Sequence, residues 1–130
     1  MLKLKGVLLM ALAAVFLIGC GGNEQQLKKG DRLIVTEGLS REKIGMEYTD
    51  GSTDGTNTDV PKGTVLEVVI TPKVGASMVE VIPVEVDGKN DPEEIQEFFV
   101  PKRFRKRDGF VSYSLVLKNE HIGTKVKIAE

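Results

Sequence analysis

The chain has one cysteine and one histidine in 130 residues, so thiolate and imidazole chemistry depend on Cys20 and His121 alone. His121 lies within Asn119–Gly123, a sequence typical of a surface turn. Histidine catalysis needs a neighbouring hydroxyl or thiol and a third group that orients the ring, and no local spacing around His121 provides them. Glu93, Glu94 and Glu97 could supply paired carboxylates, but they fit the solvated face of a helical turn. The sequence therefore predicts a protein that is not an enzyme, with a small hydrolase as an alternative.

The segment Asp50–Asp59 places oxygen-bearing side chains at alternate positions, as a calcium-binding loop of the EF-hand type does. Its first, third and fifth positions are Asp50, Ser52 and Asp54, and a glycine follows as the sixth. The match ends there, because the twelfth position is Pro61 rather than a bidentate glutamate, and the flanking sequences look like strands. We therefore expect a long, polar surface loop that binds no metal, with these three side chains as the metal candidates if the protein is metal-dependent.

Lys102–Arg107 concentrates five cations in six residues around one aromatic side chain, Phe104. On a strand, Arg103, Arg105 and Arg107 would share one face and Phe104 would point inward. Such a face could hold lipid phosphate groups, at roughly 1 kcal/mol per cation near an anionic membrane, or dock an acidic partner or glycan. A solvated strand or turn protected by its charges explains the same residues. The candidate patch for an anionic partner consists of Lys102, Arg103, Arg105, Lys106 and Arg107.

The first 20 residues have the composition of an export signal. Two lysines within Met1–Lys5 precede an uncharged and mostly apolar run, Gly6–Ile18. As a helix, this run would reach roughly 20 Å, which is short of the roughly 30 Å hydrocarbon core of a membrane. It is therefore predicted to be a cleaved signal and not a membrane-spanning helix.

The four residues Leu17-Ile18-Gly19-Cys20 at the end of this run resemble the lipobox of bacterial lipoprotein precursors. The resemblance implies cleavage between Gly19 and Cys20, diacylglycerol on the Cys20 sulfur and often acylation of the new amino group. More than one acyl chain makes such an anchor stable, because a single chain holds a protein only marginally. An ordinary secretory signal or an uncleaved helix would leave the position of Cys20 to chance. By resemblance to enterobacterial lipoproteins, Gly21 favours the outer membrane in a cell that has one.

The sequence divides into a signal at 1–19, a lipidated start and flexible tether at 20–30, and one β-rich domain at 31–130. Gly21–Gly30 is polar and bounded by glycines, and a linker of this length spans about 16–19 Å on average, with a limit near 35 Å. The domain would thus work close to the lipid surface. With 18 Lys+Arg and 19 Asp+Glu, the chain has no overall attraction for nucleic acid, which an exported domain does not meet.

From residue 31 onward, apolar residues recur with a period of two, which is typical of half-buried strands. Thr64–Thr71 is apolar on both faces, as a central strand would be, and Pro83 indicates an edge or a bulge. Near the end of the chain, Val111, Tyr113, Leu115 and Leu117 are expected on one face. The clearest strand patterns lie at 32–36, 43–48, 64–71, 77–86, 110–118 and 124–128.

One short helical turn is expected near 92–99, because Asp91 is an N-cap acid, Pro92 follows at the first helical position and Glu94 is at the third. The stretch Ile95–Val100 could instead be a strand. Turn-forming residues separate the predicted elements at 72–76, 87–88, 108–109 and 119–123.

Six or seven short strands predict an all-β domain, either a small barrel or a β-sandwich. The order of Leu33-x-Val35, Lys62-Gly63-Thr64-x-Leu66-x-Val68, Val79-x-Val81 and Phe99-Val100-Pro101 is similar to that of bacterial SH3-like domains. The resemblance covers roughly residues 31–104 and implies a small SH3-like barrel. The chain departs from it in having no tryptophan and in continuing with strands after Phe110.

These observations predict a lipid-anchored envelope protein whose β-domain is a non-enzymatic binding or assembly module close to the membrane. Its expected partner is another envelope protein or the cell wall. A surface-exposed lipoprotein that binds host or environmental ligands is the second interpretation, and a small hydrolase or metal-dependent protein is the third. No cofactor is expected beyond the covalent lipid on Cys20.

Overall fold

The structure of the protein is a computed structural model that describes residues 27–129. The predicted signal at 1–19, Cys20 and the start of the tether lie outside the described residues. The strands are β3 (Arg32–Val35), β4 (Leu39–Tyr48), β5 (Thr53–Val60), β6 (Val65–Val68), β7 (Met78–Glu85), β8 (Phe110–Lys118) and β9 (Val126–Ile128). The helical elements are α2 (Pro92–Phe99), α3 (Lys102–Arg105) and a 3-10 turn, η2 (Asn119–His121).

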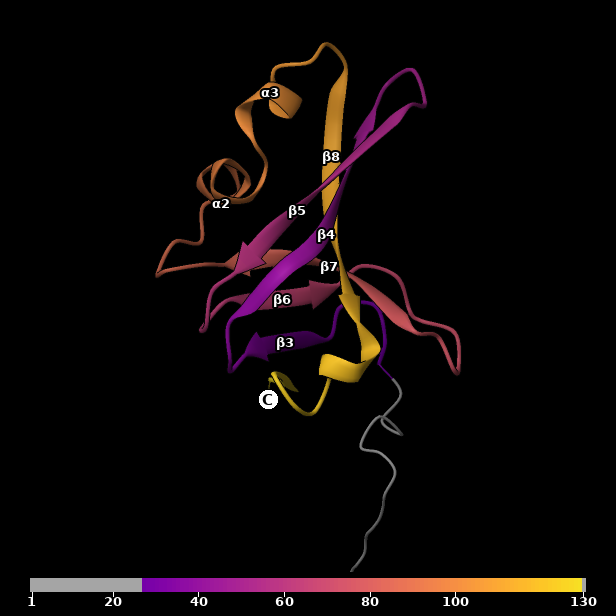
Figure 1. The fold of residues 1–130 in the computed structure, drawn as a ribbon, viewed down its shortest axis with the longest axis vertical. Coiled ribbons are helices and arrows are strands. Elements are labelled where there is room, and N and C mark those ends of the chain that lie inside the picture. The colour runs from indigo at the N-terminus through magenta and orange to yellow at the C-terminus, as the bar shows by residue number, and fades with distance from the viewer. Residues whose placement is uncertain (1–26, 130) are drawn as a thin grey trace, which may run out of the picture.

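The seven described strands form a single antiparallel sheet in the order β5-β4-β8-β7-β6-β3-β9 (Figure 1). The predicted all-β fold is confirmed. β6 lies inside the sheet between β3 and β7, as expected from its apolar sequence, although it is shorter than the predicted strand. Neither helix within 27–129 is long and apolar enough to cross a membrane.

The hydrophobic core is built from alternate residues of the strands. In β4 the predicted alternation is confirmed, because Ile44, Met46 and Tyr48 are all buried. The short helix α2 packs against the same core with Ile95 and Phe99. The strands and α2 thus enclose one core. The alternate side chains of each strand, which point to the other face of the sheet, lie nearer to solvent.

The predicted helical turn is confirmed as α2, and the alternative of a strand at Ile95–Val100 is wrong. Asp91 caps the helix, since its carboxylate accepts a hydrogen bond of 3.1 Å from the backbone N–H of Glu94. Pro92 occupies the first turn, where its missing N–H costs no hydrogen bond. These local signals decide between helix and strand here, because the apolar residues alone fit both.

The prediction for Pro83 is confirmed as well. The pairing of β6 with β7 shifts in register between Val65 and Leu66, which lie opposite Glu85 and Pro83. One extra residue on β7 makes this a bulge. β8 pairs with β7 only over Met78–Val81, so Pro83 lies beyond the part of β7 that needs donors toward β8.

Two further predictions are corrected by the structure. Val111 does not share the buried face of β8 and is 56 % exposed, because a register shift opposite Glu47 and Tyr48 leaves it as the extra residue of a bulge. Phe110 instead packs against the core and lies edge-on to the Tyr48 ring. The segment Asp50–Asp59 is not a long loop, since most of it forms the strand β5, which pairs with β4.

Tyr113 gives the fold a pH dependence at the alkaline end. Burial of its phenol raises the pKa of Tyr113 to about 12, while the unfolded chain ionises near the ordinary value of 10.0. Between these values the unfolded state loses this proton first, so the free energy of unfolding falls as the pH rises from about 10 to about 12. We expect Tyr113→Phe to reduce this loss, as measured by urea denaturation at pH 9 to 12. An unchanged alkaline slope would contradict this assignment.

Candidate functional site

The predicted metal candidates lie in and beside the turn between β4 and β5, where their oxygens have other partners. One carboxylate oxygen of Asp50 accepts hydrogen bonds from the Ser52 backbone N–H at 2.9 Å and from the Ser52 hydroxyl at 2.6 Å. These bonds lower the pKa of Asp50, because they stabilise the ionised carboxylate. Residues 27–129 contain no group of three or more histidine, cysteine or acidic side chains placed to hold a metal ion.

The third candidate, Asp54, forms a cluster with Tyr48, which lies across the hairpin in β4, and with Arg107, which lies far along the chain. Its carboxylate accepts hydrogen bonds from Arg107 at 2.7 Å and from the Tyr48 hydroxyl at 3.1 Å. The Arg107 guanidinium also lies over the Tyr48 ring, 4.0 Å from its centre. The hydrogen bond to Asp54 raises the pKa of Arg107 above its ordinary value, because it stabilises the charged guanidinium. This cluster fastens the end of the basic segment to the β4–β5 hairpin.

Lys102–Arg107 does not form the strand on which a shared cationic face would depend. Pro101 starts a new helical turn after α2, and Lys102–Arg105 forms α3. Phe104 packs against the core, as expected, although it does so from a helix and not from a strand. The alternating cationic face does not exist, because a helix distributes consecutive side chains around its axis.

The five cations of this candidate patch have different roles. Arg105 donates a hydrogen bond of 3.0 Å to the Val100 carbonyl, and Arg107 is held by Asp54 as described. The Arg103 guanidinium lies 4.5 Å from the centre of the Phe104 ring. Lys102 and Lys106 are exposed. At least two of the five cations therefore serve the fold, which leaves a smaller free charge than the sequence suggested.

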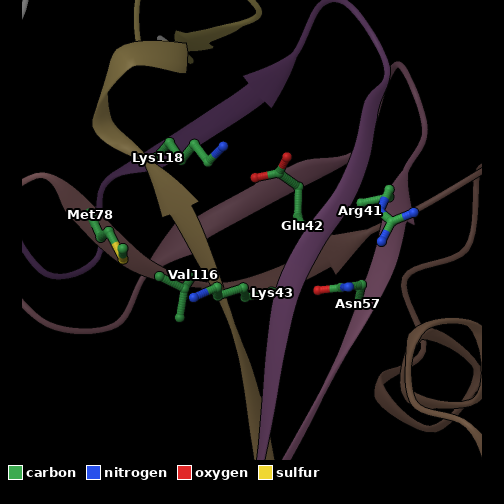
Figure 2. A pocket seen from close by; sticks show the side chains of 7 residues that line it. All are labelled: Arg41, Glu42, Lys43, Asn57, Met78, Val116 and Lys118. Atoms are coloured by element: carbon green, nitrogen blue, oxygen red, sulfur yellow. The ribbon is translucent and has the colours of Figure 1, made fainter.

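A site that the sequence analysis missed lies between β4 and β8. Their pairing ends at Lys43 and Val116, beyond which β8 pairs only with β7 and β4 only with β5. A hollow of about 130 Å³ opens at this fork (Figure 2). We call it the β4–β8 hollow; its lining residues are Arg41, Glu42, Lys43, Asn57, Met78, Val116 and Lys118.

Glu42 is buried at this position, with only 7 % of its surface exposed. Its carboxylate lies 3.6 Å from Nε2 of His121, the distance of an ion pair when the imidazole is protonated. His121 does lie in a turn, η2, but its side chain is only 14 % exposed, so the prediction of a surface histidine is wrong. The two residues are far apart in sequence and meet because η2 follows β8 directly.

A bulge in β4 directs Glu42 inward. The register of β4 against β5 shifts between Leu39 and Glu42, and Arg41 within this shift has a φ of 57°. The Asp59 carboxylate accepts a hydrogen bond of 3.0 Å from the Arg41 backbone N–H and so stabilises the bulge. Glu42 then falls in phase with the buried residues Ile44 and Met46, a spacing that could have marked it as inward-facing.

Three cations surround the hollow from two strands. Arg41 and Lys43 come from β4 and Lys118 from β8, and all three are exposed. None of their side chains forms an ion pair with another described residue. Figure 2 shows the Glu42 carboxylate between the Lys118 and Arg41 side chains. The hollow thus combines three unpaired cations with one carboxylate that has its own partner, His121.

Comparison of the chain with protein-family models, with characterised proteins and with solved structures finds no match. The chemistry of the hollow therefore has to follow from its own residues. Its charges suit an anionic group, and the side chains of Met78 and Val116 offer an apolar surface beside it.

Proposed function

We propose that this protein is a lipid-anchored envelope lipoprotein whose β-domain is a non-enzymatic binding module. The sequence Leu17-Ile18-Gly19-Cys20 supports the anchor, and Gly21 favours the outer membrane in a cell that has one. Leu27, at the start of the described residues, is buried in the core, so only a short segment separates Cys20 from the folded domain. A module held this close to a membrane meets envelope partners at high effective concentration.

The observation that carries the binding function is the set of three unpaired cations around the β4–β8 hollow. Arg41, Lys43 and Lys118 would receive a carboxylate or phosphate group of the partner, and the Asn57 amide could orient it. Burial of Glu42 against His121 keeps the one acid of the hollow engaged within the domain. The site therefore selects for negative charge.

An envelope protein fits the hollow better than a cell-wall glycan. Met78 and Val116 lie beside the cations, and a protein segment can place an apolar side chain next to an acidic one. A sugar would set its hydroxyl groups against this apolar surface and lose hydrogen bonds to water. The proposed partner is therefore a protein that presents an acidic side chain with an apolar neighbour.

The pair of Glu42 and His121 is the one observation that favours the second candidate, a small hydrolase. An acid that orients a histidine is two-thirds of a nucleophilic triad. Both side chains, however, are largely buried and face each other, so a substrate would have to displace them to reach the imidazole. Binding remains the function that this geometry supports best.

Charge reversal at the hollow tests the binding function. A photo-crosslinking amino acid is placed at position 57, in the hollow, and the protein is produced in cells. Two chains are compared: one that is otherwise unchanged, and one that also carries Lys43→Glu and Lys118→Glu. We expect a crosslink to one envelope protein, and a loss of at least about tenfold in the double variant, because acid would then face acid. The matched control, Lys62→Glu with Lys127→Glu, makes the same change in charge at exposed positions elsewhere.

The outcomes separate the interpretations. Retention of the crosslink in the control and its loss in the double variant would support the hollow as the binding site. Equal loss in both variants would show that only overall charge matters, and equal retention would exclude the hollow. A crosslink to cell-wall fragments would replace the protein partner with a glycan.

A further inference from the structure

The loop between β6 and β7, residues 69–77, and the first residue of β7 expose large apolar side chains. Val74 is 90 % exposed and Ile70 is 58 % exposed, and Met78 at the start of β7 is 46 % exposed. Of the large hydrophobic side chains exposed in the described residues, only Phe98 and Val111 lie elsewhere. Such a concentration in one loop is typical of a contact surface.

The backbone of this loop presents Val74 at its tip. The Ala76 N–H donates a hydrogen bond of 3.0 Å to the Lys73 carbonyl and so closes a four-residue turn. Gly75, with a φ of 82°, supplies the left-handed conformation that this turn needs. Val74 is therefore held away from the core by a defined turn and not by an irregular chain.

The tether enters the domain beside this loop. The Lys29 N–H donates a hydrogen bond of 2.9 Å to the Thr71 hydroxyl, and the Gly30 N–H donates one of 2.8 Å to the Val68 carbonyl. The loop and the entering chain lie at the same end of the molecule (Figure 1). Cys20 and Lys29 are nine residues apart, a distance that spans about 15–18 Å on average and about 30 Å at most. A lipid on Cys20 would thus hold this loop close to the bilayer.

The charges of this end suit the surface of an anionic bilayer. Lys28, Lys29 and Lys73 are exposed, and residues 69–79 contain no acidic residue. The one acid of the entering chain at 27–31, Asp31, is half-buried and accepts a hydrogen bond of 2.9 Å from the Lys28 backbone N–H. Lysine ammonium groups can stay among phosphate groups while neighbouring apolar side chains enter the interface. The basic segment around α3 lies at the opposite end of the longest axis, so the bilayer that holds the tether would not meet it (Figure 1).

We propose that the loop 69–77, with Lys28 and Lys29, is the face through which the domain rests on the membrane. Ile70 and Val74 insert among the headgroups, and the three lysines bind anionic lipid. This proposal rests on the proposed lipid anchor, since the tether places the loop at the bilayer. It also assigns membrane contact to a different surface from the segment Lys102–Arg107.

The test uses the lipidated full chain in vesicles of phosphatidylcholine with phosphatidylglycerol. The lipid occupies the sulfur of Cys20, so Val74→Cys introduces one free thiol for an environment-sensitive fluorophore. The matched control is Phe98→Cys, an exposed apolar position in α2. We expect blue-shifted emission and quenching by doxyl-labelled lipids for the label at position 74, and neither for the label at position 98. Lys28→Gln, Lys29→Gln and Lys73→Gln together should weaken the quenching at least about fivefold, in the way that removing phosphatidylglycerol does.

Each result assigns or excludes the membrane face. Flotation of the protein with the vesicles reports the anchor, independently of the fluorophore. If the chain does not float, the proposed anchor is wrong; if it floats while the label at 74 stays in water, the anchor holds and the proposed face is wrong. Quenching at 98 in place of 74 would assign the contact to the side of the domain that carries α2. A blue shift without quenching by doxyl lipids would mean that a second copy of the chain covers the loop, which also overturns the proposal.

Discussion

Cys20→Ala is expected to leave a full-length precursor that takes up no palmitate. The sulfur of Cys20 is the predicted attachment point of the diacylglycerol, and alanine has no nucleophile to replace it. The residual segment Gly6–Ile18 is too short to span a membrane comfortably, so membrane retention of the precursor should also be weaker. Metabolic labelling with palmitate measures the lipid attachment, and the electrophoretic mobility of the chain measures the cleavage.

Gly22→Ala is the matched control for this experiment, because it makes a similarly small change within the tether but outside the lipobox residues. The control should be labelled and processed as the unchanged chain is. Normal labelling and processing of Cys20→Ala would exclude the lipoprotein assignment. Processing without labelling, in both the unchanged chain and the control, would instead indicate an ordinary secretory signal.

Leu66→Ala is expected to lower the free energy of unfolding by about 3 kcal/mol. Leu66 lies in β6, between β3 and β7, and its surface exposure is 0 %. Its removal would leave a cavity that neighbours on two paired strands cannot fill by small movements. Urea denaturation of the protein expressed from residue 21 onward measures the change, provided that the slope of the transition stays constant.

Ile70→Ala is the control for Leu66→Ala, since Ile70 follows closely in the chain but is 58 % exposed. Its effect on the free energy of unfolding should stay within about 0.5 kcal/mol, the usual range for surface positions. Similar losses for both variants would mean that Leu66 is not packed in the core. The comparison therefore tests the packing of the buried face of β6.

Much of the fold could be predicted because its signals are local. The alternation of Ile44, Met46 and Tyr48 predicts a strand with one buried face, and Asp91 with Pro92 predicts the start of α2. β5 was missed because it is an outer strand in which only Val60 is buried, so its threonines and aspartates carry no hydrophobic period. Val111 was placed on the wrong face because one bulged residue reverses the alternation.

The β4–β8 hollow could not be predicted in the same way, because its parts meet only through the sheet. Lys43, Asn57 and Val116 are neighbours on three paired strands but distant in sequence. The contact between Glu42 and His121 depends on a bulge and on the path of the chain after β8. No spacing along the chain encodes such a contact. What the sequence did offer was the inward phase of Glu42 with Ile44 and Met46.

The pairing of β3 with β9 joins the first and last strands of the described residues, with Leu33 opposite Ile128 and Val35 opposite Val126. A chain that crosses a membrane from its amino end presents β3 long before β9 arrives. Until then one edge of β3 has no partner strand, and the buried side chain of Val126 is missing from the core. Bringing these distant segments together costs chain entropy, and this cost is offset only by the contacts that the pairing makes. For a chain that emerges from its amino end, as the proposed export implies, the pairing that completes the described sheet therefore forms only when almost all of the chain is present.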